Sequence, residues 1–187
     1  MRIFTYLFTA ILTAVILSGC FFSRSAPTTI YTLATAPNIS NESTAAVFVG
    51  FRDCSGTGRD FMCKVSEYKV VRDEFSCWQQ SPSELLTSYL RQSFATESEP
   101  QKTFYIQGSF NSFIIDIPNK EVSFQLNYTI SRNETDMNPE RFSGRYRAYF
   151  KEATPEAFAR AYSKAAAQCA ADLKKKMIAM NKVKSTK

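Results

Sequence analysis

The chain has 187 residues, of which 44% are hydrophobic, and a formal net charge of +6 at pH 7. Arg2 and the six lysines of the last fourteen residues account for seven positive charges, so residues 20–173 carry a net charge of −1. A nearly neutral body lacks the basic face of a nucleic-acid-binding domain, so we expect no nucleic-acid partner. The length suits one domain that buries roughly 68–70% of its unfolded surface and needs no metal to fold.

An N-terminal secretory signal ends at a cysteine. A long uncharged run follows Arg2 and ends in Leu17-Ser18-Gly19-Cys20. A short cationic start, an apolar run and small residues before a cleavage point are typical of a signal peptide. The order Leu-Ser-Gly-Cys resembles the lipobox of bacterial lipoproteins, which implies cleavage before Cys20 and acylation of that residue. The alternative is an uncleaved transmembrane helix, close to the shortest length that spans ~30 Å of hydrocarbon.

The signal and the local composition divide the chain into four segments. Residues 1–19 form the signal peptide, and residues 20–46 form a lipidated, flexible leader that is rich in Ser, Thr, Pro and Asn and contains one short strand. Residues 47–178 form the folded domain. Residues 179–187 form a basic tail, which is either a solvated helix end or a contact for anionic headgroups at ~1 kcal/mol per lysine.

Hydrophobic alternation predicts six strands. They lie at 30–33, 47–51, 68–75, 104–117, 122–130 and 141–150. A turn is expected at Cys54–Gly58, and a change of parity near Asn111-Ser112 indicates a bulge. The last two strands alternate apolar and polar residues, as antiparallel strands of a sheet with one covered face do.

Two helices are predicted from their start signals. Ser81-Pro82-Ser83-Glu84 combines a capping serine, a proline at the first helical position and a glutamate three residues after the cap. Thr154-Pro155-Glu156 begins the last helix in the same way. The order β-β-β-α-β-β-β-α then predicts an α+β two-layer sandwich, with an antiparallel or mixed sheet of about six strands and both helices on one face. The apolar stripes of the two helices are Leu85, Leu86, Tyr89, Leu90 and Phe94, and Phe158, Ala161, Tyr162, Ala165, Cys169 and Leu173.

Four cysteines remain once Cys20 carries lipid. The periplasm is oxidising, so disulfides are expected, and four cysteines allow three pairings. We favour Cys54 with Cys63, across a turn, and Cys77 with Cys169, which would meet if both helices cover the same face. A zinc site is the alternative, but the chain has no histidine and no Cys-x-x-Cys, so we expect no metal.

No residue pattern points to an enzyme or to a cofactor. The lack of histidine removes the Ser-His-Asp and Cys-His arrangements, and no phosphate-binding glycine loop occurs. Asp73 and Glu74 are neighbours on a strand and point to opposite faces, so they do not form a glycosidase pair. Arg145 and Arg147 share a strand face, where they either bind an anionic headgroup or are solvated. Trp78 beside the helix cap is either a core plug or an interface anchor.

Several motifs follow the lipobox in a defined order. They are Tyr31-Thr32-Leu33, the segment Val70–Trp78, the leucine-rich helix start at 81–90, the glycine-bearing strand Ile106-Gln107-Gly108-Ser109-Phe110, and Pro155-Glu156-Ala157. In this order the mature chain resembles the ABC-type transport auxiliary lipoproteins, the family of the PqiC-like proteins. The four further cysteines and the lysine tail depart from the family pattern.

The resemblance implies a non-catalytic periplasmic partner of an MCE-type (mammalian-cell-entry-like) protein and its ABC transporter, which moves phospholipids or other hydrophobic molecules across the envelope. It also implies that a homo-oligomer is plausible. Phe21 rather than aspartate follows Cys20, which favours the outer membrane by resemblance to enteric sorting. The alternative is a free envelope lipoprotein that activates cell-wall synthesis or assists assembly of outer-membrane machinery.

Overall fold

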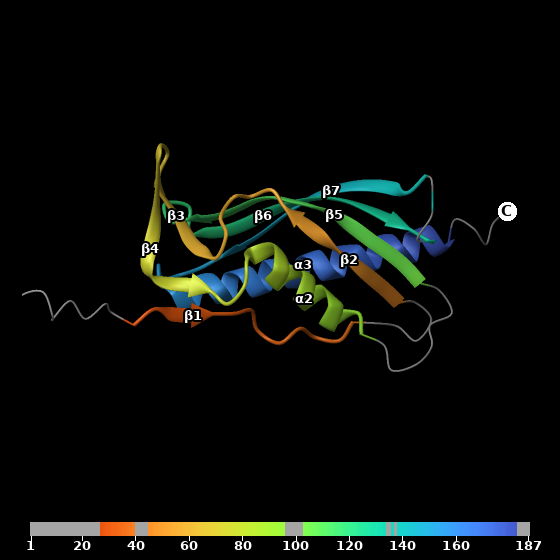
Figure 1. Cartoon of the computed structure of the whole chain (residues 1–187), viewed down its shortest axis with the longest axis horizontal. Coiled ribbons are helices and arrows are strands. Elements are labelled where there is room, and N and C mark those ends of the chain that lie inside the picture. The colour runs from red at the N-terminus through yellow and green to blue at the C-terminus, as the bar shows by residue number, and fades with distance from the viewer. Residues whose placement is uncertain (1–26, 40–44, 96–102, 134–135, 137, 183–187) are drawn as a thin grey trace, which may run out of the picture.

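The computed structural model describes residues 27–39, 45–95, 103–133, 136 and 138–182 (Figure 1). The signal peptide, Cys20 and the last five residues of the predicted tail lie outside the described residues. The elements in chain order are β1 (Thr29–Tyr31), β2 (Ala45–Asp53), β3 (Asp60–Ser66), β4 (Lys69–Trp78), α2 (Pro82–Ser93), β5 (Thr103–Asp116), β6 (Glu121–Ser131), β7 (Glu140–Tyr149) and α3 (Pro155–Lys182).

The long strand β5 organises the sheet. β6 pairs antiparallel with β5 along most of its length, and β7 pairs antiparallel with β6. On its other edge β5 pairs in parallel first with β2 and then with β3, so these two strands follow one another along the same edge. The sheet ends at β7 on one side and, through β4, at the short strand β1 on the other.

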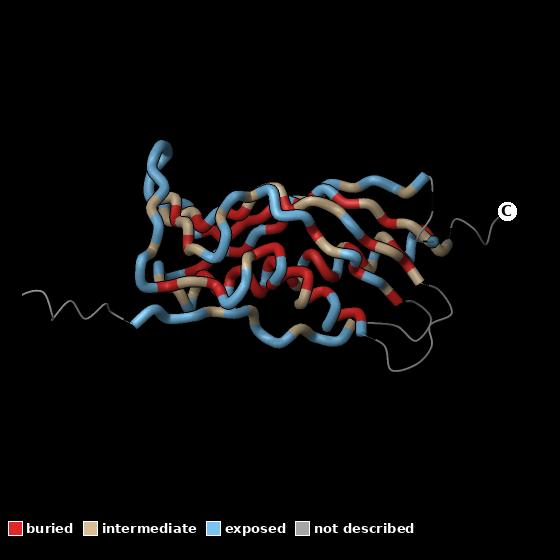
Figure 2. Tube along the Cα trace, in the orientation of Figure 1, coloured by how far each residue is buried: buried red, intermediate tan, exposed pale blue. Residues whose placement is uncertain are grey.

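Both helices cover one face of this sheet. α3 packs on β6 and β7, α2 packs on β2, and the two helices contact each other. The strand side chains that face the helices are buried, as the alternation along β6 shows from Val122 to Ile130 (Figure 2). The predicted α+β sandwich is therefore confirmed. Within the described ranges, neither helix combines the length and the apolar character needed to cross a bilayer.

The helices begin where their caps predicted. Ser81 Oγ accepts a hydrogen bond from the Glu84 N–H at 3.4 Å, and the Glu84 carboxylate accepts one from the Ser81 N–H at 3.0 Å, which completes a capping box. Thr154 Oγ1 accepts a bond from the Ala157 N–H at 3.3 Å at the start of α3. All residues of the two predicted apolar stripes are buried.

The structure adds a strand to the six that were predicted. β3 follows the predicted turn, in which Gly56 and Gly58 have φ angles of 70° and 56°. Only Phe61 and Cys63 are buried along β3, so its hydrophobic signal is too short to separate from the turn before it. The bulge expected near Asn111 is confirmed by a register shift in the β5–β6 pairing between Phe110 and Ser112.

Gly108 lies where the backbone of β6 leaves no room for a side chain on β5. A Cβ atom at this position would lie 2.7 Å from the Cα and 2.8 Å from the Cβ of Tyr128, and closer still to the carbonyl oxygen of Asn127. Most of these atoms belong to the backbone, so they cannot move aside without breaking the β5–β6 ladder. Only glycine fits here.

We predict that Gly108→Ala lowers the free energy of unfolding by about 1–3 kcal/mol, because the added methyl overpacks a rigid ladder. Ser109→Ala is the matched control on the same strand, since its side chain lies on the open face of the sheet. Urea unfolding of the two variants measures the difference. Equal stabilities would show that the close approach of β5 and β6 carries no such constraint.

Candidate functional site

The sheet face turned away from the helices is open. No described helix or strand packs on it. Its side chains are the alternate strand residues that the core does not use, and most of them are amides, hydroxyls and arginines. The candidate site is this open face, because polar side chains gather there without an internal partner layer.

An open groove of about 690 Å³ crosses the open face over β2, β5, β6 and β7. Gln107 and Ser109 of β5 and Asn127 and Thr129 of β6 lie along its middle. The volume is within the ~300–1,000 Å³ range of ligand pockets, but such pockets are usually enclosed, whereas this groove is open to solvent. A broad groove of amides and hydroxyls suits a hydrogen-bonding segment of another molecule better than an acyl chain.

Two arginines flank this groove. Arg52 on β2 aligns with Ser109, and Arg141 on β7 aligns with Thr129, so the two stand three strand spacings apart, roughly 14 Å across the sheet. Both are exposed, and neither guanidinium has a hydrogen-bond or ion-pair partner among the described residues. Uncompensated positive charge on both sides favours an anionic ligand.

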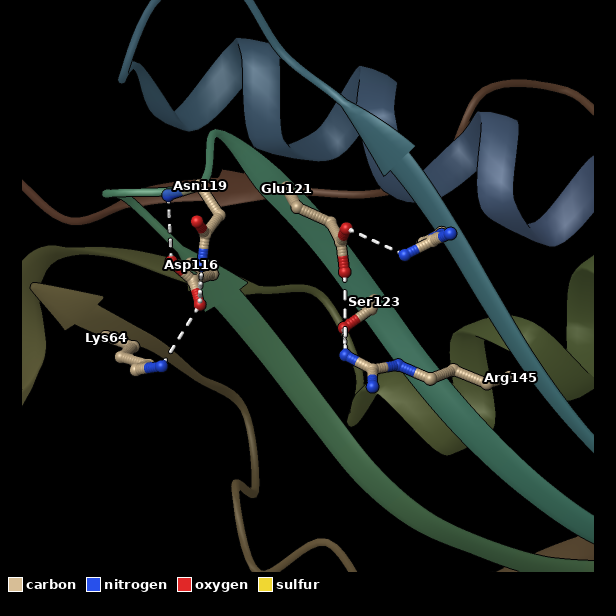
Figure 3. A network of polar contacts seen from close by, with 7 residues as sticks. Lys64, Asp116, Asn119, Glu121, Ser123 and Arg145 are labelled. Carbon is tan, nitrogen blue, oxygen red and sulfur yellow. Dashed lines mark hydrogen bonds and ion pairs between the residues drawn. The ribbon is translucent and has the colours of Figure 1, made fainter. Parts of the chain in front are cut away.

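One polar network lies where β5 turns into β6 (Figure 3). Lys64 Nζ lies 3.3 Å from a carboxylate oxygen of Asp116, and the backbone and side-chain N–H groups of Asn119 both donate to that carboxylate at 3.0 Å. Burial alone would raise the pKa of Asp116, but the hydrogen bonds from Asn119 and Lys64 lower it. The network fixes the turn that leads into the open face.

The second network contains the two arginines singled out from the sequence. The Glu121 carboxylate lies 3.6 Å from Arg145 Nη2 and 3.8 Å from Arg147 Nη1, and Arg145 also donates to Ser123 Oγ at 3.5 Å. Both arginine side chains are more than 60% exposed, so each ion pair contributes ~0–1 kcal/mol. Glu121 neutralises one of the two charges, which leaves this end of the face net positive.

A different polar cluster holds α3 against the sheet. Asp172 accepts hydrogen bonds from Tyr146 Oη and from Lys176 Nζ, each at 2.7 Å, and Lys176 also donates to Tyr128 Oη at 2.6 Å. Burial would raise the pKa of Asp172, but its hydrogen bonds with Lys176 and Tyr146 lower it. Lys176 also lies over the Phe142 ring, 4.9 Å from its centroid. The cluster serves packing, because it faces the covered side of the sheet.

The two disulfides favoured from the sequence are absent, and the four described cysteines are free thiols. Asp53 of β2 pairs with Phe110 of β5, and Cys54 comes directly after Asp53. Cys63 of β3 pairs with Ile115, which lies roughly 15 Å farther along β5 than Phe110. That separation exceeds the Cα–Cα limit of ~7 Å for a disulfide. The expected hairpin-like closure was wrong because β2 and β3 run in the same direction.

The second favoured pair fails because its cysteines lie on different faces. Trp78 is buried toward the helices, so its strand neighbour Cys77 points away from them. Cys169 is fully buried on α3, and burial raises its thiol pKa. Burial, and then the charge of Asp73, raise the pKa of Cys63 to about 11. Both buried thiols are therefore packing groups.

Trp78 is a core plug and not an interface anchor. Its ring is fully buried, stacks on Phe61 with centroids 4.1 Å apart, and makes edge contacts with Phe113 and Tyr162. No partner is present for its Nε1 among the described residues. Among the described residues, no group of three or more His, Cys, Asp or Glu side chains is placed so that it could hold a metal ion.

Arg52 and Arg141 were not among the site residues predicted from the sequence. Both stand at polar positions of alternating strands, directly after Phe51 and directly before Phe142. That signal identifies the open face, but only the pairing of β2 with β5 and of β6 with β7 brings the two arginines to one groove.

No family model matches this chain, and no curated protein matches it. Solved structures share its fold. An uncharacterised protein aligns with a TM-score of 0.63 at 9% identity, over 81% of this chain and 99% of its own. A Xanthomonas campestris protein of the DUF330 family aligns with a TM-score of 0.61 at 12% identity, over 85% of this chain and all of its own. These similarities show the fold.

We predict that Asp172→Asn destabilises the protein by about 1–3 kcal/mol at pH 7, because it weakens a partly buried charge-assisted cluster. The folded pKa of Asp172 is lowered, so its stabilisation is complete above about pH 5 and is lost as the pH falls through the folded pKa. Urea unfolding should therefore show a smaller difference from the wild type at pH 3 than at pH 7. A constant difference would contradict an ionised Asp172 in the cluster.

Proposed function

We propose that this protein is a lipid-anchored, periplasm-facing accessory component of an ABC/MCE-type envelope transporter. The lipobox before Cys20 and the order of the motifs after it carry the proposal. The fold supports it, since a DUF330 protein shares the architecture over 85% of this chain. In this role the protein does no chemistry: it holds a partner at the envelope by its acyl chains and its folded surface.

The groove supplies the partner-binding surface in this proposal. Its occupant is an acidic, extended segment of the MCE-type periplasmic protein, whose carboxylates pair with Arg52 and Arg141 while its backbone bonds to the amides and hydroxyls between them. Charge complementarity argues for this occupant, because both arginines lack a carboxylate partner within the described chain. A transported lipid suits the groove poorly, since acyl chains need an apolar enclosure.

A free lipoprotein that activates cell-wall synthesis or outer-membrane assembly is the second function considered. An acidic segment of a partner could bind the groove in that role as well. The identity of the crosslinked partner therefore distinguishes the transporter role from the free-lipoprotein role. Capture of a second copy of this chain through the groove would instead indicate a homo-oligomer built on this face. The placement in the outer membrane belongs to the same proposal and rests on Phe21 after Cys20.

We predict that a photo-crosslinking amino acid at Ser109, in the groove, captures the MCE-type protein in cells. Arg52→Glu combined with Arg141→Glu should lower the yield at least tenfold, because each reversed charge repels the acidic segment. Arg160→Glu is the matched control, since Arg160 is an exposed arginine on α3, on the covered side of the sheet. Mass spectrometry of the crosslinked band identifies the partner.

An unchanged yield in the double variant would remove the groove from the proposal, and recovery of a cell-wall synthase instead would replace the transporter role. The double variant and the Arg160→Glu control are both expected to fold, because none of the three arginines belongs to the core.

We predict that the mature protein begins at Cys20 and carries two or three acyl chains, since a single chain gives only marginal anchoring. Intact-mass measurement of protein extracted from membranes tests this directly. The Cys20→Ser variant should lose the lipid mass and retain the leader. A free thiol at the first residue of the wild-type protein would refute the anchor.

A further inference from the structure

Exposed apolar side chains concentrate at one corner of the molecule. Ile30 of β1 is 60% exposed, Tyr68 between β3 and β4 is 91% exposed, and Val70 and Phe75 of β4 are 56% and 57% exposed. Val65 of β3, at 38%, completes this corner. These five make up half of the ten large hydrophobic residues that are exposed in the described chain.

The β3–β4 hairpin projects from the body at this corner. Figure 1 shows it rising from the end of the molecule at which β1 begins, and α3 ends at the opposite end. The residues from Val65 to Val70 are all exposed, so the tip packs against nothing in the described chain (Figure 2).

The hairpin from Asp60 to Trp78 carries four acidic residues, Asp73 and Glu74 among them, and three basic residues, so its net charge is −1. Lys64 pairs with Asp116 at 3.3 Å, and Arg72 pairs with Asp60 at 3.0 Å. At the tip, Glu67 and Lys69 bring one charge of each sign on either side of Tyr68. Such a tip, with an amphipathic tyrosine flanked by a lysine, is typical of a segment that rests in the interface between water and lipid.

The lipid anchor lies within reach of this tip. The chain from Cys20 to Pro27 extends no more than ~25 Å, because each residue spans at most ~3.6 Å. β1 runs parallel to β4 with Thr29 beside Ser76, and the stretch of β4 from Lys69 to Ser76 spans no more than ~24 Å. The two lengths match, so a bilayer that holds the acyl chains can touch the hairpin.

We propose that the β3–β4 hairpin is a membrane-contact element, which inserts Tyr68 and the neighbouring Val65 and Val70 into the headgroup region of the bilayer that holds Cys20. This inference rests on the proposed lipid anchor. The second contact fixes the orientation of the domain, whereas the anchor alone is a single point of attachment about which the domain can rotate. The sheet then presents its groove to the periplasm at a set angle.

Fluorescence of a tryptophan placed at the tip tests the proposal. The probe is full-length Tyr68→Trp, purified with its acylated N-terminus and reconstituted into phosphatidylethanolamine–phosphatidylglycerol vesicles with or without brominated acyl chains. Trp78, the one native tryptophan, is fully buried and supplies a constant background. Tyr105→Trp on β5, at the opposite end of the sheet, is the matched control.

We predict that brominated lipid quenches the Tyr68→Trp variant severalfold more strongly than the Tyr105→Trp variant, and that the emission of the tip probe shifts to the blue. Equal and weak quenching of both variants, in protein that floats with the vesicles and carries acyl chains by mass, would overturn the hairpin contact and leave the anchor intact. Protein that fails to float would refute the anchor itself. Shielding of the tip probe only on addition of a protein partner would also overturn the inference, because the hairpin would then be a protein-docking element.

Discussion

Tyr162 of α3 fixes how the two layers meet. Its ring makes edge contacts with Trp78 of β4, Phe113 of β5 and Phe124 of β6, with the shortest centroid distance, 4.8 Å, to Phe113. Its hydroxyl donates to the carbonyl of Pro82 at the start of α2. One fully buried side chain thus joins three strands and both helices. Burial raises the pKa of Tyr162 well above its usual value, so the hydroxyl stays a donor across the physiological range.

This arrangement leaves the sheet with one covered face. Most apolar residues of the strands contact α2 and α3, so the alternate residues face outward in a mainly polar surface. This surface also carries Val47, Val49, Ile114 and Tyr149. Two register shifts, at Phe48/Gly50 and at Phe110/Ser112, fall on β2 and β5, two of the four strands that the groove crosses. Bulges bend a sheet and increase its local twist, which suits a hollowed surface.

The local patterns in the sequence predicted the layers but could not predict the pairings. Alternation along β6 and the caps at Ser81 and Thr154 depend on neighbours in the chain, and each was visible in the sequence. β3 and the collinear placement of β2 and β3 depend on β5, which lies some forty residues downstream of β3. The same long-range pairing explains why the favoured disulfides were wrong and why Arg52 and Arg141 went unnoticed.

The edges of the sheet bear on how a partner would bind the open face. β1 is only three residues long, and a short edge strand offers few unpaired backbone groups. The opposite edge, β7, carries Arg141, Arg145 and Arg147 on one face, and charged edge strands resist the addition of another strand. β2 is a third edge: it pairs only with β5, and Arg91 of α2 donates to the carbonyl of its residue Phe48. The groove is the surface that combines polar side chains with positive charge on both sides. In the proposed role, a partner on this face would be recognised by side-chain hydrogen bonds and charge pairing.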